Sequence, residues 1–418
     1  LCRAMAQLVH DEGMCIDVAT GGELHVARAA GVPADRLDAL HAEDGEVARA
    51  VVRVTPGVEA HTHEYVMTGQ VDSKFGFGLA SGAAAGAAGA QSAEPPRERK
   101  HVTAFFDSET PLTMALTTNI RQIRNDKKDE APWRDATISV AGANGNQAVL
   151  PIKVRTRGIW RLNNCEFPPI RLNFARGSTK GTPFEGLDKP KLVNYCRNND
   201  RFEQYLLQEL QLYRIYQLLT PISHRARLVR MTYVDSASGK THASRLAIFL
   251  EEPDAMAERL GGQMLEQQGA VKADLDPHQN LLFGVFQYFA ANTDWSTLML
   301  HNVELVIRPD GTLLPVAFDF DFAGAVNAPY ATTDPKLPIR HVRQRLYRGI
   351  CAPPDQLAQI FAVFNEKKDA IYALYRDDIG KLLLPEFTRE ALKYYDEFYE
   401  TINDPKKARR EFVEGCRE

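Results

Sequence analysis

Long apolar runs, metal-binding cysteine patterns and a strong charge of either sign are all missing from this 418-residue sequence. No run approaches the ~18–20 apolar residues that cross a bilayer, so no membrane span is expected. The formal net charge of −4 gives no reason to expect nucleic acid as a partner. The first residue is Leu1, and neither a charged start nor an apolar signal core follows it. An upstream part is therefore expected to be missing.

The six cysteines are widely scattered and show neither CxxC nor Cys/His zinc spacing. They are too sparse for a disulfide scaffold, so free thiols are the favoured interpretation. Pairing of Cys165 with Cys196 or with Cys351 stays an alternative for a secreted domain.

The sequence that is present has the composition of a globular protein, with 44% apolar and 25% charged residues. Its length allows two or three domains. Residues 79–100 form a low-complexity Ala/Gly stretch followed by polar residues and the pair Pro95-Pro96. Such a segment offers little side chain to pack, so it is predicted to be a linker. It lies between a segment at 1–88 and a domain at 101–418.

Residues 1–88 show the pattern of a βαβ unit, with a buried strand at 15–18, a helix from Gly21 to about Gly31 and a second strand at 48–54. The runs 17–24 and 53–77 resemble diaminopimelate decarboxylases, which are pyridoxal-phosphate (PLP) enzymes of lysine biosynthesis built on a TIM barrel. In this resemblance Asp17, Glu23 and His61 match positions of the family's motif blocks.

The resemblance covers only part of such a barrel. Between Leu37 and Ala48 the chain has about ten residues where the family carries further barrel strands and helices. A segment this short cannot close a barrel that typically takes ~250 residues. The family's cofactor-binding lysine would precede Leu1. We therefore expect an incomplete TIM-barrel-derived βα fragment without decarboxylase activity, and PLP as a cofactor only if the fragment is functional. A working diaminopimelate decarboxylase is kept as an alternative.

From residue 101 the pattern predicts short strands at 102–106, 112–117, 137–141, 149–155, 169–174 and 191–195. The turn at Asn144-Gly145 predicts a hairpin. A helix is predicted at 201–219, with Asp200 and Glu203 as a capping box. A further strand pair is predicted at 227–234 and 243–250.

One carboxylate, Glu209, falls on the apolar face of the helix at 201–219. An unpaired buried charge is very costly, so Glu209 is expected to meet a cation. Lys191 is the first candidate, and Arg171 and Lys153 compete with it. A Glu209 at the edge of the apolar face, with its head group in solvent, is equally consistent with the pattern.

The stretch 289–324 carries the candidate chemistry. Asp294 and Asn302 follow an apolar helix, and a hairpin at 303–307 and 313–318 then leads to Asp319 and Asp321. Carboxylate and amide oxygens are the ligands that hard divalent cations prefer. The order of an Asp, an Asn, a hairpin and another Asp is also that of protein kinases.

Together with Arg157-Gly158, this ordered set resembles the spore-coat protein H (CotH) family of kinase-like proteins. The resemblance implies an α+β, two-lobed protein-kinase-like fold, with an antiparallel-sheet N-lobe at 101–252 and a helical C-lobe at 253–418. It implies Asp294 as the catalytic base. It further implies Asn302, Asp319 and Asp321 as metal ligands. It implies Lys191, Glu209 and Arg171 as phosphate-binding residues.

The leading hypothesis is an ATP- and Mg²⁺-dependent phosphotransferase that acts on a hydroxyl of a protein or small molecule and is fused to an inactive decarboxylase fragment. Two departures from the kinase pattern are the long Asp294-to-Asn302 spacing and the missing G-x-G-x-x-G loop. They favour the alternative of a catalytically silent, structural kinase-like module. Localisation stays open: cytoplasmic for a decarboxylase, secreted or periplasmic for the kinase-like part.

Overall fold

The structure is a computed structural model. It describes residues 105–129, 131–141 and 147–416, together with four two-residue strands nearer the N-terminus. The chain divides into two compact units, Leu1–Glu98 and Arg99–Glu418. The predicted linker, most of the predicted βα fragment, Glu23 and His61 lie outside the described residues. The proposed lobe boundary at 252/253 stays a prediction.

In the first unit, the described strands form two parallel pairs. β1 (Ile16–Asp17) pairs with β2 (Leu37–Asp38), and β3 (Val54–Thr55) pairs with β4 (Phe77–Gly78). Parallel strands need a crossover connection. The strand predicted at 48–54 is not the partner of β1, which pairs with Leu37–Asp38 instead. β1 lies within the predicted strand at 15–18.

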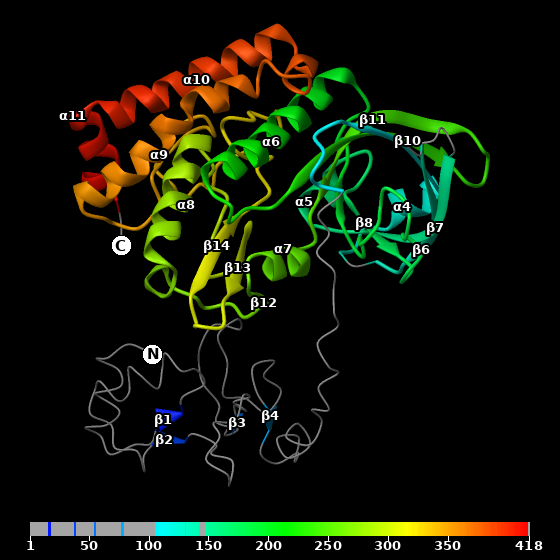
Figure 1. The fold of residues 1–418 in the computed structure, drawn as a ribbon, viewed down its shortest axis with the longest axis horizontal. Coiled ribbons are helices and arrows are strands. Elements are labelled where there is room, and N and C mark those ends of the chain that lie inside the picture. Colours follow the sequence, from blue (N-terminus) through cyan, green and yellow to red (C-terminus); the bar gives the residue numbers. More distant parts are fainter. Residues whose placement is uncertain are drawn as a thin grey trace. The chain divides into compact units, whose positions relative to one another are not determined.

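The second unit begins with a closed seven-stranded barrel, drawn in cyan to green in Figure 1. Around the barrel the strand order is β10-β11-β9-β8-β7-β6-β5. All neighbouring strands are antiparallel except β5 and β10, whose parallel pairing closes the barrel. The strands are β5 (Leu112–Thr118), β6 (Arg134–Ala141), β7 (Gln147–Thr156), β8 (Ile170–Phe174), β9 (Lys191–Val193), β10 (Ala226–Asp235) and β11 (Thr241–Leu250).

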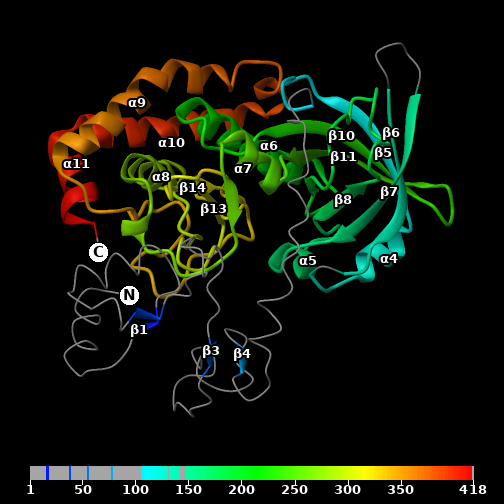
Figure 2. The ribbon, with the colours of Figure 1, turned by 60° about the horizontal axis from the view of Figure 1, so that its bottom comes forward.

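Alternation along the strands fills the barrel. In β8, residues Ile170, Leu172 and Phe174 are buried while the residues between them are partly exposed. Successive side chains of a strand point to opposite faces, so every second residue enters the core. Two short helices, α4 (Ile120–Asn125) and α5 (Trp160–Asn164), lie between barrel strands (Figure 2). The predicted strand at 102–106 is wrong where it is described, because residues 105–106 form a turn.

Helix α6 (Asp200–Leu219) joins the barrel to the helical part of the unit (Figure 1). The cap differs from the prediction: Asn199, not Asp200, is the N-cap, and its side chain accepts a hydrogen bond from the Phe202 amide. The helix ends at Leu219, just before the predicted stop at Pro221. α6 is buried on nearly all sides because the barrel strands β10 and β11 pack on one side of it and α9 on another.

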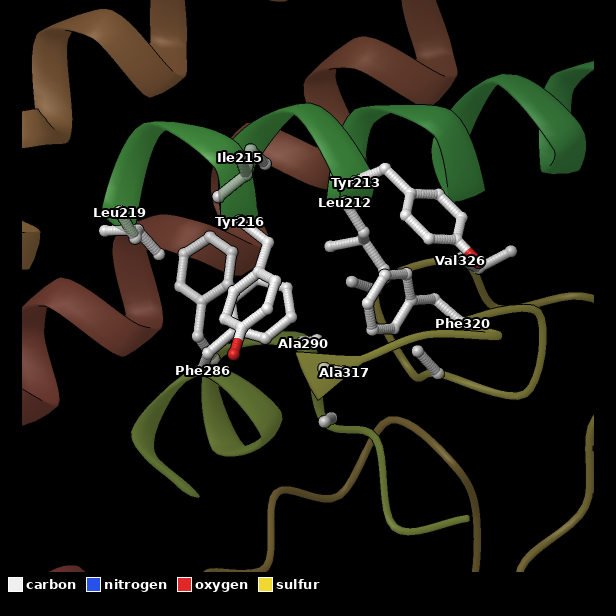
Figure 3. Packing of buried hydrophobic residues seen from close by; sticks show 14 of the residues in the cluster. Leu212, Tyr213, Ile215, Tyr216, Leu219, Phe286, Ala290, Ala317, Phe320 and Val326 are labelled. Carbon is white, nitrogen blue, oxygen red and sulfur yellow. The ribbon is translucent and has the colours of Figure 1, made fainter. Parts of the chain in front are cut away.

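The helical part surrounds a three-stranded antiparallel sheet, β12-β13-β14. Aromatic rings from α6, α8 and the segment after β14 meet in the hydrophobic core of this helical part. Figure 3 shows Tyr213, Tyr216, Phe286 and Phe320 within that core. The elements are α7 (Pro253–Arg259), β12 (Gln263–Leu265), η3 (Lys272–Asp274), α8 (Pro277–Ala290), β13 (Val303–Ile307), β14 (Leu313–Ala317), α9 (Pro354–Ala373), η4 (Gly380–Leu382), α10 (Pro385–Asn403), α11 (Pro405–Ala408) and η5 (Arg409–Glu414).

Two disulfides correct the prediction of free thiols. Cys165 is bonded to Cys196, one of the two alternatives left open, and Cys351 is bonded to Cys416. The composition argument failed because pairing depends on which cysteines the fold brings together, which scattered positions do not reveal. Within the described part of the chain, no helix combines the length and apolar character needed to cross a membrane.

Candidate functional site

Asp294 lies in a loop that its neighbours hold in place. α8 ends at Ala290, and the next residue, Ala291, caps the helix in a left-handed conformation with φ of 49°. The side-chain oxygen of Asn292 then accepts a hydrogen bond from the Asp294 amide at 3.1 Å, and the Trp295 indole donates to the Asn292 carbonyl at 3.2 Å. These bonds turn the chain sharply after the helix. They direct the Asp294 side chain away from the buried core, so that side chain stays partly exposed to solvent.

Asp294 meets both residues that follow it in the predicted motif. Its carboxylate lies 2.8 Å from His301 Nε2 and accepts a hydrogen bond from the Asn302 amide nitrogen at 3.0 Å. The same nitrogen donates to the Asp294 carbonyl at 2.8 Å. The hydrogen bond with Asp294 raises the pKa of His301, with partial burial opposing it. Asp294 and Asn302 therefore come together across the loop.

Backbone strain gathers in this region. Every described non-glycine residue with positive φ falls between 291 and 327, namely Ala291, Leu300, Asn302, Asp319 and Asn327. Such conformations are uncommon outside glycine and concentrate where a structure fixes functional groups. Two of the five are the candidate metal ligands Asn302 and Asp319.

Asp319 and Asp321 follow β14, which ends at Ala317, one residue before the predicted end at 318. Tyr213 on α6 accepts a hydrogen bond from the Asp319 amide at 2.9 Å. The Phe320 ring points the other way and packs on Tyr213 and Phe286, with ring centroids 4.7 and 5.5 Å apart (Figure 3). Phe320 thus anchors the segment between the two carboxylates in the core.

Asp321 is buried, and the pKa of its carboxyl group is shifted upward. Burial and the neighbouring Asp319 carboxylate raise the pKa of Asp321 well above its usual value. The Tyr330 hydroxyl donates to Asp321 Oδ2 at 3.2 Å, and Arg161 NH1 lies 4.0 Å from the same oxygen. Desolvation is the larger effect because the side chain of Asp321 is only 7% exposed.

Glu209 is paired with Arg161, which corrects the expected partner Lys191. Glu209 lies on the buried face of α6, and its Oε2 is 3.6 Å from Arg161 NH1. Its other oxygen, Oε1, is buried and has no hydrogen-bond partner among the described residues. Burial raises the pKa of Glu209 to about 7, although Arg161 lowers it. The prediction of an inward carboxylate that meets a cation is confirmed, but the cation was misassigned.

Lys191 belongs to a separate buried cluster. Its Nζ lies 2.7 Å from Glu304 Oε1, and His224 Nε2 lies 2.6 Å from the other Glu304 oxygen. Burial alone would raise the pKa of Glu304, but Lys191 and His224 hold it well below its usual range. Lys191 lies on β9 and Glu304 on β13, so this cluster ties the barrel to the three-stranded sheet.

The remaining basic candidates, Lys153 and Arg171, differ in how far their side chains are exposed to solvent. Lys153 is exposed and pairs with Asp135 at 3.7 Å, so it does not serve Glu209. Arg171 on β8 is partly buried, and its Nε has no hydrogen-bond partner in the described part of the chain. The Nε atoms of Arg157 and Arg161 are likewise buried and have no hydrogen-bond partner among the described residues. Burial lowers the pKa of Arg157, and Asp319 opposes that effect.

Sequence reasoning missed the roles of Arg161 and Tyr330. Arg161 stands on α5 and Tyr330 in the loop after Gly324, and neither lies in a pattern that marks a buried partner. The two Arg161 contacts join residues 48 and 160 positions away. Only the fold shows such pairings. Across residues 105–129, 131–141 and 147–416, no three His, Cys, Asp or Glu side chains are grouped as metal ligands.

Comparison with known proteins finds matches to decarboxylases. Residues 35–94 match the family described as pyridoxal-dependent decarboxylase, pyridoxal binding domain. The diaminopimelate decarboxylase of Bacillus subtilis is 40% identical over 113 residues, which cover 19% of this chain and 26% of that protein. Those of Bacillus methanolicus (36% identical; 19% and 27% covered) and Mycobacterium tuberculosis (38% identical; 20% and 26% covered) are similar.

The chain therefore spans about a quarter of the length of the curated relatives it matches. These matches confirm the resemblance of the N-terminal segment to diaminopimelate decarboxylases and support PLP as the associated cofactor. They overturn the leading functional hypothesis: they point to a PLP decarboxylase, and nothing in them supports a kinase, the spore-coat protein H family, ATP or magnesium. The phosphotransferase assignment is wrong because it rested on an ordered set of polar residues that many folds can present.

Proposed function

We propose that this chain carries a pyridoxal-binding segment of the diaminopimelate decarboxylase type, and that its activity, if the segment is complete in function, is PLP-dependent decarboxylation. The match of residues 35–94 to the pyridoxal binding domain supports this proposal most directly. The cofactor, when bound, supplies an electron sink for decarboxylation. Glu23 and His61 lie outside the described residues, and of Asp17 only the backbone is described, so no step is assigned to them.

PLP enzymes hold their cofactor through a lysine amine. Lys74 is the only lysine among residues 1–98 of the sequence. It lies inside the segment that matches the pyridoxal binding domain. The resemblance places the family's own cofactor lysine before Leu1, so a covalent anchor inside this segment would have to be Lys74, a role that the resemblance does not assign to it.

The test uses the full chain incubated with PLP, reduced with borohydride and mapped by peptide mass spectrometry. We expect a pyridoxyl label on Lys74, its loss in Lys74→Arg, and no change in the control Lys153→Arg, because Lys153 is an exposed lysine of the second unit. Release of carbon dioxide from diaminopimelate measures the lyase activity. A chain that takes up no PLP under any of these conditions would refute the proposal.

The carboxylates of the second unit favour a second candidate function, binding of a divalent cation. We propose that Asp319 and Asp321, with the amide oxygen of Asn302, hold such an ion together with an anionic ligand, since magnesium commonly takes one or two carboxylates and completes its shell from outside. Two observations support this: Asp319 raises the pKa of Asp321, and the buried Glu209 Oε1 has no partner among the described residues.

Thermal unfolding with added MgCl₂ or MnCl₂ tests the cation site. An ion that binds only the folded state raises the melting temperature, and the rise grows with the logarithm of the ion concentration above its Kd. The rise is expected to vanish in Asp321→Asn and to persist in Asp378→Asn, a control carboxylate whose side chain is almost fully exposed. An equal response of both variants would assign the effect to nonspecific ion binding.

A further inference from the structure

A groove of about 740 Å³ opens beside the loop that carries Asp294. Its walls come from η3, the start of α8, the loop at 295–298 and the segments 336–338 and 346–351. The apolar wall includes Leu275, Trp295, Tyr347 and Ile350. Two further apolar side chains at the groove, Val271 and Leu298, are 51% and 47% exposed. The volume is within the ~300–1,000 Å³ typical of small-molecule sites.

All charged side chains that line this groove are cations. They are Lys272, Lys336 and Arg348, and no Asp or Glu is among the lining residues within the part of the chain that the structure describes. Arg348 lies close enough to Lys272 to lower its pKa, in addition to the larger effect of burial. The positive charges of Lys336 and Arg348 favour an anion in this groove.

The two inner cations are held in position by backbone oxygens. Arg348 donates to the Trp295 carbonyl at 3.1 Å and to the Thr293 carbonyl, and its guanidinium lies 5.1 Å from the centroid of the Trp295 ring. Lys272 donates to the Gly349 carbonyl at 3.2 Å. The acidic groups whose fields reach Arg348 are Asp294 and Asp334, neither of which lines the groove. Preorganised charges of this kind lose little freedom when a ligand binds.

We propose that this groove binds an amphipathic carboxylate, a molecule with an unbranched apolar body and one anionic head group. The apolar body would cover the exposed faces of Val271 and Leu298, and the head group would meet Lys336 and Arg348. Burial of the apolar chain supplies most of the affinity, and the cations select the sign of the head group. Because Arg348 also holds the carbonyls on either side of Asp294, the ligand would bind next to the loop of the candidate site.

The probe is sodium decanoate, titrated into the full chain by calorimetry below its aggregation concentration. Decanol and decyltrimethylammonium have the same chain with a neutral and a cationic head. We expect saturable binding of decanoate at one site, binding at least tenfold weaker for decanol, and none for the cationic analogue. Equal affinity for all three probes, or no saturable binding of decanoate, would overturn the proposal.

Variants locate the binding site. Lys336→Gln removes an exposed cation from the groove, and Leu298→Asp places a negative charge on its apolar wall. We expect a roughly fivefold loss of decanoate affinity for the first, since an exposed ion pair contributes up to about 1 kcal/mol, and a loss beyond detection for the second. Lys381→Gln, an exposed lysine on η4, is the matched control and should leave affinity unchanged.

Both groove variants change partly or fully exposed side chains, so their melting temperatures are expected to match the parent chain. Unchanged decanoate binding in Leu298→Asp with a normal melting temperature would place the ligand elsewhere and refute the assignment. The outcome is independent of PLP binding by residues 1–98, because the probe and the variants concern only the second unit.

Discussion

Replacing Glu209 by Gln should stabilise the protein at high pH much more than at low pH. Burial raises the pKa of Glu209 from 4.5 to about 7 in the folded state, while the unfolded chain keeps the lower value. Below pH 4.5 both states are protonated, and the group contributes nothing to pH dependence. Between pH 4.5 and 7 the unfolded state loses its proton first, so the stability of the parent chain falls as pH rises.

The magnitude follows from the shift. One pKa unit corresponds to about 1.4 kcal/mol, so a shift of about 2.5 units costs the folded state roughly 3 kcal/mol above pH 7. Part of this cost is already present at pH 5, because the unfolded state has begun to ionise there. Gln does not titrate. The difference in unfolding free energy between variant and parent should therefore increase by roughly 2–3 kcal/mol from pH 5 to pH 8.

Urea unfolding at several pH values measures this difference. Glu390→Gln, an exposed carboxylate on α10, is the matched control, since its removal relieves no burial. The opposing force is the ion pair of Glu209 with Arg161 at 3.6 Å, which favours the charged carboxylate. If the difference for Glu209→Gln stays constant within ~0.5 kcal/mol across this range, the ion pair outweighs burial and the reasoning fails.

Three further predictions concern the framework of the second unit. Lys191→Met should cost about 3–5 kcal/mol because it leaves Glu304 buried without its cation. The double variant with Glu304→Leu should recover most of that loss in urea unfolding. A double variant as unstable as the single one would argue against this explanation. Gly324→Ala should lower stability by roughly 1–3 kcal/mol, since the added Cβ would lie 2.2 Å from a backbone carbonyl oxygen, and an unchanged melting temperature would contradict that packing. Cys351→Ser should lose about 2–5 kcal/mol in urea unfolding relative to the chain with its bond to Cys416, and an unchanged stability would argue against that bond.

Local patterns predicted most elements of the second unit closely. The hairpin expected at 303–307 and 313–318 is observed at Val303–Ile307 and Leu313–Ala317, and the helix expected at 201–219 is observed at Asp200–Leu219. Alternation and turn residues act over a few positions, so they can be recognised without the fold. The likeness of the whole unit to a protein kinase stays a prediction.

The pairings between distant residues could not be predicted in the same way. Glu209 was recognised as an inward carboxylate from its place on the helix, yet its cation is Arg161 on a short helix and not Lys191 on the preceding strand. Arg161 and Lys191 both precede α6 in the sequence, and only the closed barrel determines which of the two side chains reaches Glu209. The disulfides show the same limit. Their cysteines are 31 and 65 residues apart in the sequence, and only the complete fold brings each pair together.

The parallel pairing of β5 with β10 has a consequence for the order in which the second unit can form. β5 ends at Thr118 and β10 begins at Ala226, so the edge of β5 has no partner in the barrel until more than a hundred further residues have been synthesised. During translation, strands β5 to β9 therefore form an open sheet whose exposed edge can pair with other chains. Helix α6 is made just before β10 and packs against it. Closure of the barrel and docking of α6 against it are thus expected to occur in one late, cooperative step, after β10 and β11 have been made.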